Sequence, residues 1–283
     1  MPAPHRVQDR SRDLPGFQAS FANVADTDPA VDANREWAAT IAARAATSTL
    51  GVDLVEQHTV DDPADVDRIV DAGRRAGALW GTRPVEERAT VLRQVGVELE
   101  RRRAELLEVM AAECGKTLDQ GDPEVSEAID FANYYAALAE RLDAVDGATP
   151  RPVALTVVTP PWNFPMAIPT GSTLAALAAG SAVVVKPAPQ AQRCGSLMVA
   201  ALWAAGVPTD VVQLVHPGEG DAGRRLIAHP GVDRLILTGA YETAERFLSW
   251  RPDLRLLAET SGKNAIVVTP AADLDLAVRD LVA

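Results

Sequence analysis

The strongest constraint on the fold of this chain is an alternation of short β-branched runs with short helical segments, which begins near residue 150. The runs are ALTVVTP, SAVVVKP, VVQLVHP, RLILTG, LRLLAE and NAIVVTP, and helical apolar spacing separates most of them. Strands that alternate with helices are typical of a parallel, doubly wound sheet. We therefore predict an α/β fold with such a sheet for residues 151–283.

The first half of the chain has a different pattern. Apolar residues recur at helical spacing through most of 62–142, with Gly115 expected just after one helix and Pro123 expected in the first turn of another. GVDLVEQHTV at 51–60 has strand character. Residues 1–50 are expected to form an arm and linker. We expect a mostly helical part (62–142) before the sheet, with 51–283 forming one domain.

Composition excludes several classes of function. The chain is 47% hydrophobic and 23% charged, the balance of a soluble protein. No apolar run reaches the roughly 18 residues of a membrane span, and the N-terminus lacks a secretory signal, so a cytoplasmic protein is expected. The net charge of −12 argues against nucleic acid as a partner. The two cysteines, Cys114 and Cys194, are expected to be structural, and no metal site is expected.

Unusual residues follow the strands at their carboxyl ends, the edge where parallel sheets bind ligands. The glycines of PGEGDAG (217–223) open a helix and can face an anion, although glycine also serves ordinary turns. The amide of Asn163, on a rigid Pro-rich turn, can stabilise an oxyanion, or it can cap a helix. The carboxylate of Glu259 can activate a water, or it can pair with an arginine.

Four motifs, in this order and spacing, resemble the cofactor-binding half of the aldehyde dehydrogenase superfamily: TPPWNFP, VVVKPAP, ILTGA and LAETSGKNA. EAIDFANYYA (127–136) and ETSGKNA (259–265) are similar to the branch of L-glutamate γ-semialdehyde (Δ1-pyrroline-5-carboxylate) dehydrogenases. FANVADTDP resembles a segment of bifunctional proline dehydrogenase chains. The resemblance covers roughly residues 20–283.

The resemblance implies a role for each residue at the strand ends. Asn163 would stabilise the oxyanion, Glu259 would activate water, and Glu127 would reach the aldehyde site. The expected cofactor is NAD rather than NADP. The residues implied in binding it are Thr159, Pro160, Trp162, Lys186, Gly220, Gly223, Thr238, Gly239 and Ala240.

The chain also departs from the family pattern. The family's nucleophilic cysteine is expected a few tens of residues after ETSGKNA, and the chain reaches Ala283 before it. Pro189 replaces a ribose-binding glutamate, and Ala240 replaces a serine. The resemblance therefore implies one part of a longer, homo-oligomeric enzyme, without its catalytic domain and inactive alone. The whole enzyme would oxidise a small aldehyde, L-glutamate γ-semialdehyde, in proline catabolism. Two alternatives are another aldehyde dehydrogenase and a nucleotide-binding module without catalysis.

Overall fold

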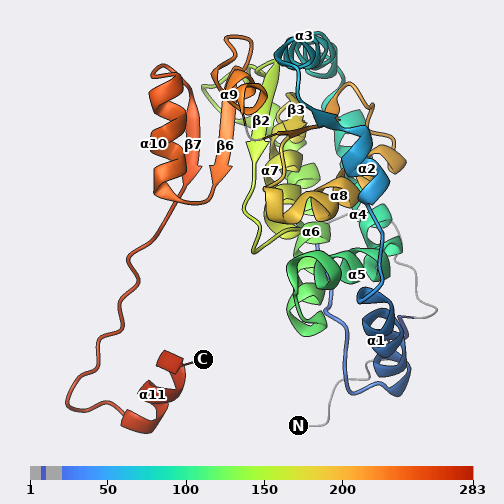
Figure 1. The fold of residues 1–283 in the computed structure, drawn as a ribbon, viewed down its shortest axis with the longest axis vertical. Coiled ribbons are helices and arrows are strands. Elements are labelled where there is room, and N and C mark those ends of the chain that lie inside the picture. The colour runs from blue at the N-terminus through green and yellow to red at the C-terminus, as the bar shows by residue number, and fades with distance from the viewer. Residues whose placement is uncertain (1–7, 11–20, 219, 283) are drawn as a thin grey trace.

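The computed structural model describes residues 8–10, 21–218 and 220–282, and Figure 1 shows their arrangement. Most of the arm predicted before residue 21 therefore lies outside the described residues, as does Glu219 of PGEGDAG. In the described part of the chain, no helix combines the length and apolar character needed to cross a membrane.

Five parallel strands form the main sheet in the order β4-β3-β2-β6-β7. Their bounds are β2 Leu155–Thr159, β3 Ala182–Val185, β4 Val212–Leu214, β6 Arg234–Thr238 and β7 Leu256–Glu259. The chain leaves β2 toward β3 and β4, then returns to the other side of β2 with β6 and β7. This reversal confirms the predicted doubly wound sheet and places its switch point between β2 and β6.

Helices cover both faces of the sheet. α7 (Ala167–Ala178) and α8 (Gln192–Ala204) pack on one face, and α3 (Pro63–Trp80), α9 (Asp221–Ala228) and α10 (Tyr241–Trp250) cover the other. A third layer packs against α7 and α8; it consists of α4 (Val85–Arg101), α5 (Arg103–Cys114) and α6 (Leu118–Ala139). The remaining elements are α1 (Asp32–Ala45), α2 (Val52–Gln57), η1 (Leu142–Ala144), η2 (Pro189–Ala191), α11 (Leu274–Val282) and a two-stranded sheet of β1 (Thr59–Val60) and β5 (His216–Pro217).

α3 shows how the sequence fixes an element and its packing. Its first turn is capped because the Asp62 carboxylate accepts the backbone N–H of Ala64 at 2.8 Å, and Pro63 occupies the first helical position. Near its other end, a Cβ atom on Gly77 would lie 1.8 Å from the backbone oxygen of Ala154. Only glycine allows the helix to approach the start of β2 this closely.

The described part of the N-terminal arm lies against the helical layer and is held by buried or half-buried charges. Arg10 donates to Glu100 at 2.6 Å, and Glu100 also accepts from Arg103 at 2.7 Å. The backbone N–H of Thr27 donates to Asp122 at 2.5 Å. Arg103 and its two carboxylate partners are each less than a tenth exposed, so Arg10 supplies the second positive charge for two buried carboxylates that share one arginine.

Several sequence expectations about local structure are wrong. GVDLVEQHTV forms α2 and only two residues of strand, because Gly51 takes a left-handed φ of 82° and the helix that follows packs on α8. α6 begins at Leu118, so Pro123 lies inside the helix and not in its first turn. VVQLVHP divides into β4 and β5, because its last residues pair with β1.

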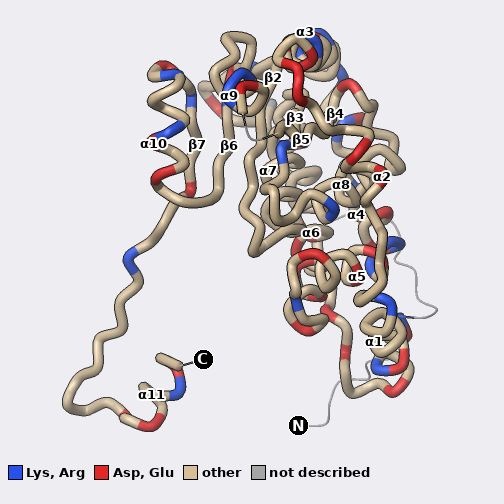
Figure 2. Tube along the Cα trace, viewed as in Figure 1, with Lys and Arg blue, Asp and Glu red and all other residues tan. Residues whose placement is uncertain are grey.

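The run NAIVVTP, predicted as a strand, forms no strand and lies in a segment that leads away from β7 to α11 (Figure 1). A strand requires a hydrogen-bonding neighbour, and no strand of the described chain pairs with this segment. From Thr260 to Ala272 it has one charged residue, Lys263, so almost all of the segment is uncharged (Figure 2). Val267 within it is 84% exposed. The segment is therefore an apolar, solvent-exposed extension of the sheet edge.

Candidate cofactor-binding site

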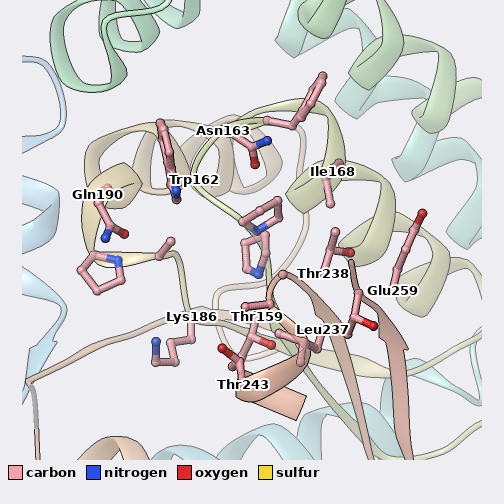
Figure 3. Close-up of a pocket in the computed structure, with 18 of the residues that line it drawn as sticks. Thr159, Trp162, Asn163, Ile168, Lys186, Gln190, Leu237, Thr238, Thr243 and Glu259 are labelled. Atoms are coloured by element: carbon pink, nitrogen blue, oxygen red, sulfur yellow. The ribbon is translucent and has the colours of Figure 1, made fainter. Parts of the chain in front are cut away.

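A pocket of about 790 Å³ opens at the carboxyl edge of the sheet, at the switch point between β2 and β6. Its walls are the turns that follow β2, β3, β6 and β7, with one side of α10. The predicted site residues that line it are Thr159, Pro160, Trp162, Asn163, Lys186, Thr238, Gly239, Ala240 and Glu259 (Figure 3). The structure thus brings together residues that are up to 100 positions apart (159 to 259) at the edge where doubly wound sheets bind ligands.

Three predicted residues do not line this pocket. Gly220 lies just before α9 and Gly223 within its first turn, while Glu127 is exposed on α6. Their roles remain predictions from the resemblance.

The turn after β2 is held by two residues of the helical layer. Lys116 donates to the backbone oxygen of Asn163 at 3.0 Å and forms an ion pair with Glu124. The other oxygen of Glu124 accepts the backbone N–H groups of Met166 and Ala167, at 3.0 and 3.2 Å. The backbone of the turn is therefore fixed on both sides of Phe164 and Pro165.

The side-chain amide of Asn163 has no hydrogen bond to any residue that the structure describes, and it is exposed at the pocket. The alternative that Asn163 caps a helix is excluded, because α7 begins at Ala167 and has no side-chain cap. A fixed backbone with an uncommitted amide is the arrangement that a preorganised oxyanion donor requires.

Sequence reasoning did not assign Lys116 and Glu124 to the site. They lie on or just before α6, far from the strand ends, and their contact with the turn depends on how α6 packs against α7. A signal for Lys116 was present, since it is one of only three lysines among 27 basic residues. Of the other two lysines, Lys186 lines the pocket, and Lys263 comes shortly after the last pocket-lining residues in the sequence.

Lys186 follows β3, and its backbone N–H donates to Val158 of the neighbouring strand at 2.9 Å. Its ammonium makes no hydrogen bond or ion pair within the part of the chain that the structure describes. Burial lowers the pKa of this ammonium below its usual value. A cation that is partly removed from water and lacks a partner is suited to hydrogen-bond the hydroxyl or phosphate oxygens of a ligand.

Glu259 ends β7 at the other side of the pocket from Lys186 (Figure 3). Its backbone oxygen accepts the N–H of Gly239 at 3.0 Å, whereas its side chain is exposed. Among the described residues its carboxylate has no arginine partner, so the alternative of a structural ion pair is not observed. The carboxylate is free to act on water or on a ligand.

A sequence model of the aldehyde dehydrogenase family matches residues 49–283. The chain belongs to the aldehyde dehydrogenase family. It is 37% identical over 252 residues to the bifunctional protein PutA of Salmonella typhimurium, a match that covers 81% of this chain and 19% of that protein. It is 32% identical over 234 residues to 1-pyrroline-5-carboxylate dehydrogenase 2 of Bacillus subtilis, which covers 76% of this chain and 45% of the relative.

Solved structures agree with this membership. Proline utilization A (PutA) from Corynebacterium freiburgense matches with a TM-score of 0.81 at 45% identity, over 92% of this chain and 26% of that one. A mutant form of Thermus thermophilus 1-pyrroline-5-carboxylate dehydrogenase matches with a TM-score of 0.81 at 27% identity, over 94% of this chain and 60% of that one. The chain therefore spans only part of the length of these aldehyde dehydrogenase relatives.

Proposed function

We propose that the pocket binds a nicotinamide dinucleotide and that residues 51–283 are the cofactor-binding domain of an L-glutamate γ-semialdehyde dehydrogenase of proline catabolism. The observation that supports binding most directly is the unpaired ammonium of Lys186 in a pocket at the switch point of the sheet. The names of the relatives, PutA and 1-pyrroline-5-carboxylate dehydrogenase, support the substrate. The proposed enzyme is homo-oligomeric, as the resemblance implies, and cytoplasmic, as the sequence composition predicts.

The residues present fit such a cofactor. Lys186 would donate to ribose hydroxyls, and the turn of Thr238, Gly239 and Ala240 would border the pyrophosphate. NAD is proposed over NADP because no arginine is among the residues that line the pocket, so a 2′-phosphate would meet Lys186 alone. Gly220 and Gly223 remain proposed as further donors to the phosphates.

A nicotinamide dinucleotide held by these residues would supply the hydride acceptor for oxidation of the substrate. The chain's own residues then act on charge and water: the amide of Asn163 donates to a developing oxyanion, and Glu259 accepts a proton from water. Glu127 is proposed to contact the substrate side. Neither Cys114 nor Cys194 lines the pocket, so no thiol of this chain is placed for attack on the aldehyde.

The proposal is tested by titrating NADH, NAD⁺ and NADP⁺ into the 283-residue chain, with cofactor fluorescence or heat as the signal. We expect saturable binding with NAD⁺ tighter than NADP⁺. Lys186→Met keeps the apolar stem but removes the donor, and should weaken NADH binding by about tenfold or more. Lys263→Met, a change of the same kind outside the pocket, is the matched control and should leave binding unchanged.

Three other results would overturn parts of the proposal. Failure of all three nucleotides to bind the folded chain would remove the cofactor site. Equal loss of affinity in both lysine variants would mean that the effect is not local to the pocket. Turnover of L-glutamate γ-semialdehyde by this chain alone is not expected, and its detection would contradict the view that the chain lacks a placed nucleophile.

A further inference from the structure

The two cysteines of the chain are 80 positions apart in sequence and meet in the structure. Cys114 is the last residue of α5, Cys194 lies in the first turn of α8, and their Sγ atoms are 3.8 Å apart. Both thiols are free. The sulfurs are therefore in contact without a covalent bond, and they belong to the only two cysteines in the sequence.

The backbone on both sides of this contact is anchored. The carboxylate of Glu113 accepts the backbone N–H of Arg193 with one oxygen and that of Cys194 with the other, both at 2.8 Å. Gly115 takes a left-handed φ of 67° and ends α5 immediately after Cys114. These contacts fix the end of one helix to the start of the other, so the approach of the two sulfurs follows from the packing of α5 on α8.

A metal ion is a second way to use this cluster, since one ligand atom each from Glu113, Cys114 and Cys194 lie within 4.8 Å of one another. Both oxygens of Glu113, however, already accept backbone N–H groups. That leaves two thiols, fewer than the three or four protein ligands of ordinary zinc sites. The geometry therefore favours a reaction between the two sulfurs.

The two thiols are unequal in exposure and acidity. The hydrogen bond with Cys194, assisted by the cations of Lys116 and Arg193, lowers the pKa of Cys114, which is half-buried. The same hydrogen bond and burial raise the pKa of Cys194 well above its usual value. Because the thiolate is the reactive form, Cys114 is the thiol that an oxidant in solution meets first, and Cys194 is the thiol held beside it.

We propose that Cys114 and Cys194 form a redox-sensitive dithiol, which closes to an intrachain disulfide when a peroxide oxidises Cys114. The Cys114 thiolate attacks one peroxide oxygen, the O–O bond breaks, and one water leaves after protonation, so that Cys114 becomes a sulfenic acid. The sulfur of Cys194 then attacks that of Cys114, its proton goes to the departing hydroxide, and the second water leaves. Overall, two thiols lose two electrons and two protons, and one hydrogen peroxide is reduced to two waters.

The dithiol is joined to the pocket through η2. The Cys114 thiol donates to the backbone oxygen of Gln190 at 3.5 Å, and Gln190 and Pro189 line the pocket beside Lys186. A disulfide sulfur has no proton, so oxidation removes this hydrogen bond as it draws the end of α5 toward α8. Oxidation should therefore loosen this wall and weaken dinucleotide binding; this second part of the inference rests on the proposed function.

The disulfide is tested without any nucleotide. The reduced 283-residue chain is treated with hydrogen peroxide, then unfolded and alkylated with N-ethylmaleimide, and its intact mass is measured. We expect a monomer that is about 2 Da lighter and takes up no label, whereas the reduced chain takes up two labels. Cys194→Ala should instead accumulate oxygen on Cys114. Cys114→Ser, which keeps a donor for Gln190, should leave Cys194 fully labelled.

Three outcomes would overturn the disulfide: two labels taken up after peroxide, a disulfide-linked dimer, or the same rate of closure in a chain already unfolded in guanidine. The last would show that the folded contact is not the cause.

The coupling between the disulfide and the pocket is tested by NADH binding. On oxidation, NADH affinity should fall about fivefold or more, and it should return with dithiothreitol. Cys194→Ala treated with peroxide and then dithiothreitol should return to its own reduced affinity. Unchanged affinity in the disulfide form would overturn the coupling. No NADH binding in either state would be a failure of the proposed function, with the mass result still deciding the disulfide.

Discussion

The two sides of the pocket differ in what lies behind them. Behind the turn of Asn163 are α6 and α7, with Lys116 and Glu124 fixing the backbone at both ends of the turn. The Glu259 side ends at β7, an edge strand of the described sheet whose Leu257 is 54% exposed, and an extended apolar segment follows it. One side is preorganised by the chain itself. The other side has no comparable anchoring contact to its side chain among the described residues.

This difference separates two requirements of the site. An oxyanion donor is effective only when it is already in position, since reorientation during the reaction would consume the stabilisation it provides. A carboxylate that activates water needs access to water and can tolerate more freedom. The helical layer is thus a direct part of the pocket, because it places the amide of Asn163, although none of its helices lines the cavity.

The largest expected effect comes from Glu124→Ala. It removes the partner of Lys116 and the acceptor of two backbone N–H groups, all of them buried or half-buried, so we expect unfolding to become easier by about 3 kcal/mol. Denaturant unfolding followed by circular dichroism measures this change.

Glu259→Ala is the matched change on the other side of the pocket. Because this side chain is exposed and has no partner among the described residues, the free energy of unfolding should change by less than about 0.5 kcal/mol. Similar losses in the two variants would contradict the comparison between an anchored and an open side.

An effect smaller than that of Glu124→Ala is expected from acid at His216, which is buried on β5. Burial, with the neighbouring charges of His58 and Lys186, lowers the pKa of His216 from 6.5 to about 4. Between these values the unfolded chain binds a proton that the folded chain does not, so stability should fall as the pH drops from 6.5 to 4. We expect His216 to account for about 2 kcal/mol of that loss.

Unfolding measured across this pH range in His216→Gln should show a shallower loss than in the unchanged chain. His58→Gln retains His216 and its burial and removes only one of the two neighbouring charges, so most of the pH dependence should remain in that variant. An identical pH dependence in the unchanged chain and in His216→Gln would show that His216 is not the responsible group.

The smallest effect should come from the extended segment. Val267→Lys places a charge on a side chain that is 84% exposed, so stability should change by less than about 0.5 kcal/mol. The chain should also associate less at high concentration, because an exposed apolar run near a sheet edge favours self-association. Thermal unfolding and sedimentation at two concentrations measure both effects. A loss of about 2 kcal/mol or more would mean that this segment is packed in solution.

The sequence predicted the sheet and most of the pocket because both depend on local patterns. Thr159, Lys186, Thr238 and Glu259 each end or directly follow a strand, and parallel strands bring their carboxyl ends to one edge. The prediction of a strand at NAIVVTP was wrong because strand formation does not depend on local pattern alone. Its β-branched residues favour an extended chain, but strand formation requires a pairing partner that a local pattern cannot supply.

Lys116 and the Cys114–Cys194 contact could not be predicted from neighbouring residues. Each depends on how α5 and α6 pack against α7 and α8, which is set by many weak apolar contacts rather than by a motif. The scarcity of lysine was the only sequence signal for Lys116. The cysteines gave no signal, since they lie 80 residues apart on different helices and share no motif.

The contacts of the N-terminal arm also determine when that arm can dock on the rest of the chain during synthesis. Arg10, Asn23 and Thr27 bind carboxylates that are 90, 107 and 95 residues later in the chain. At about 5–20 residues per second, the ribosome adds those partners only after a delay on the order of 5–20 seconds. During that interval Arg10, Asn23 and Thr27 lack these carboxylate partners, so this segment is made well before it can dock on the helical layer.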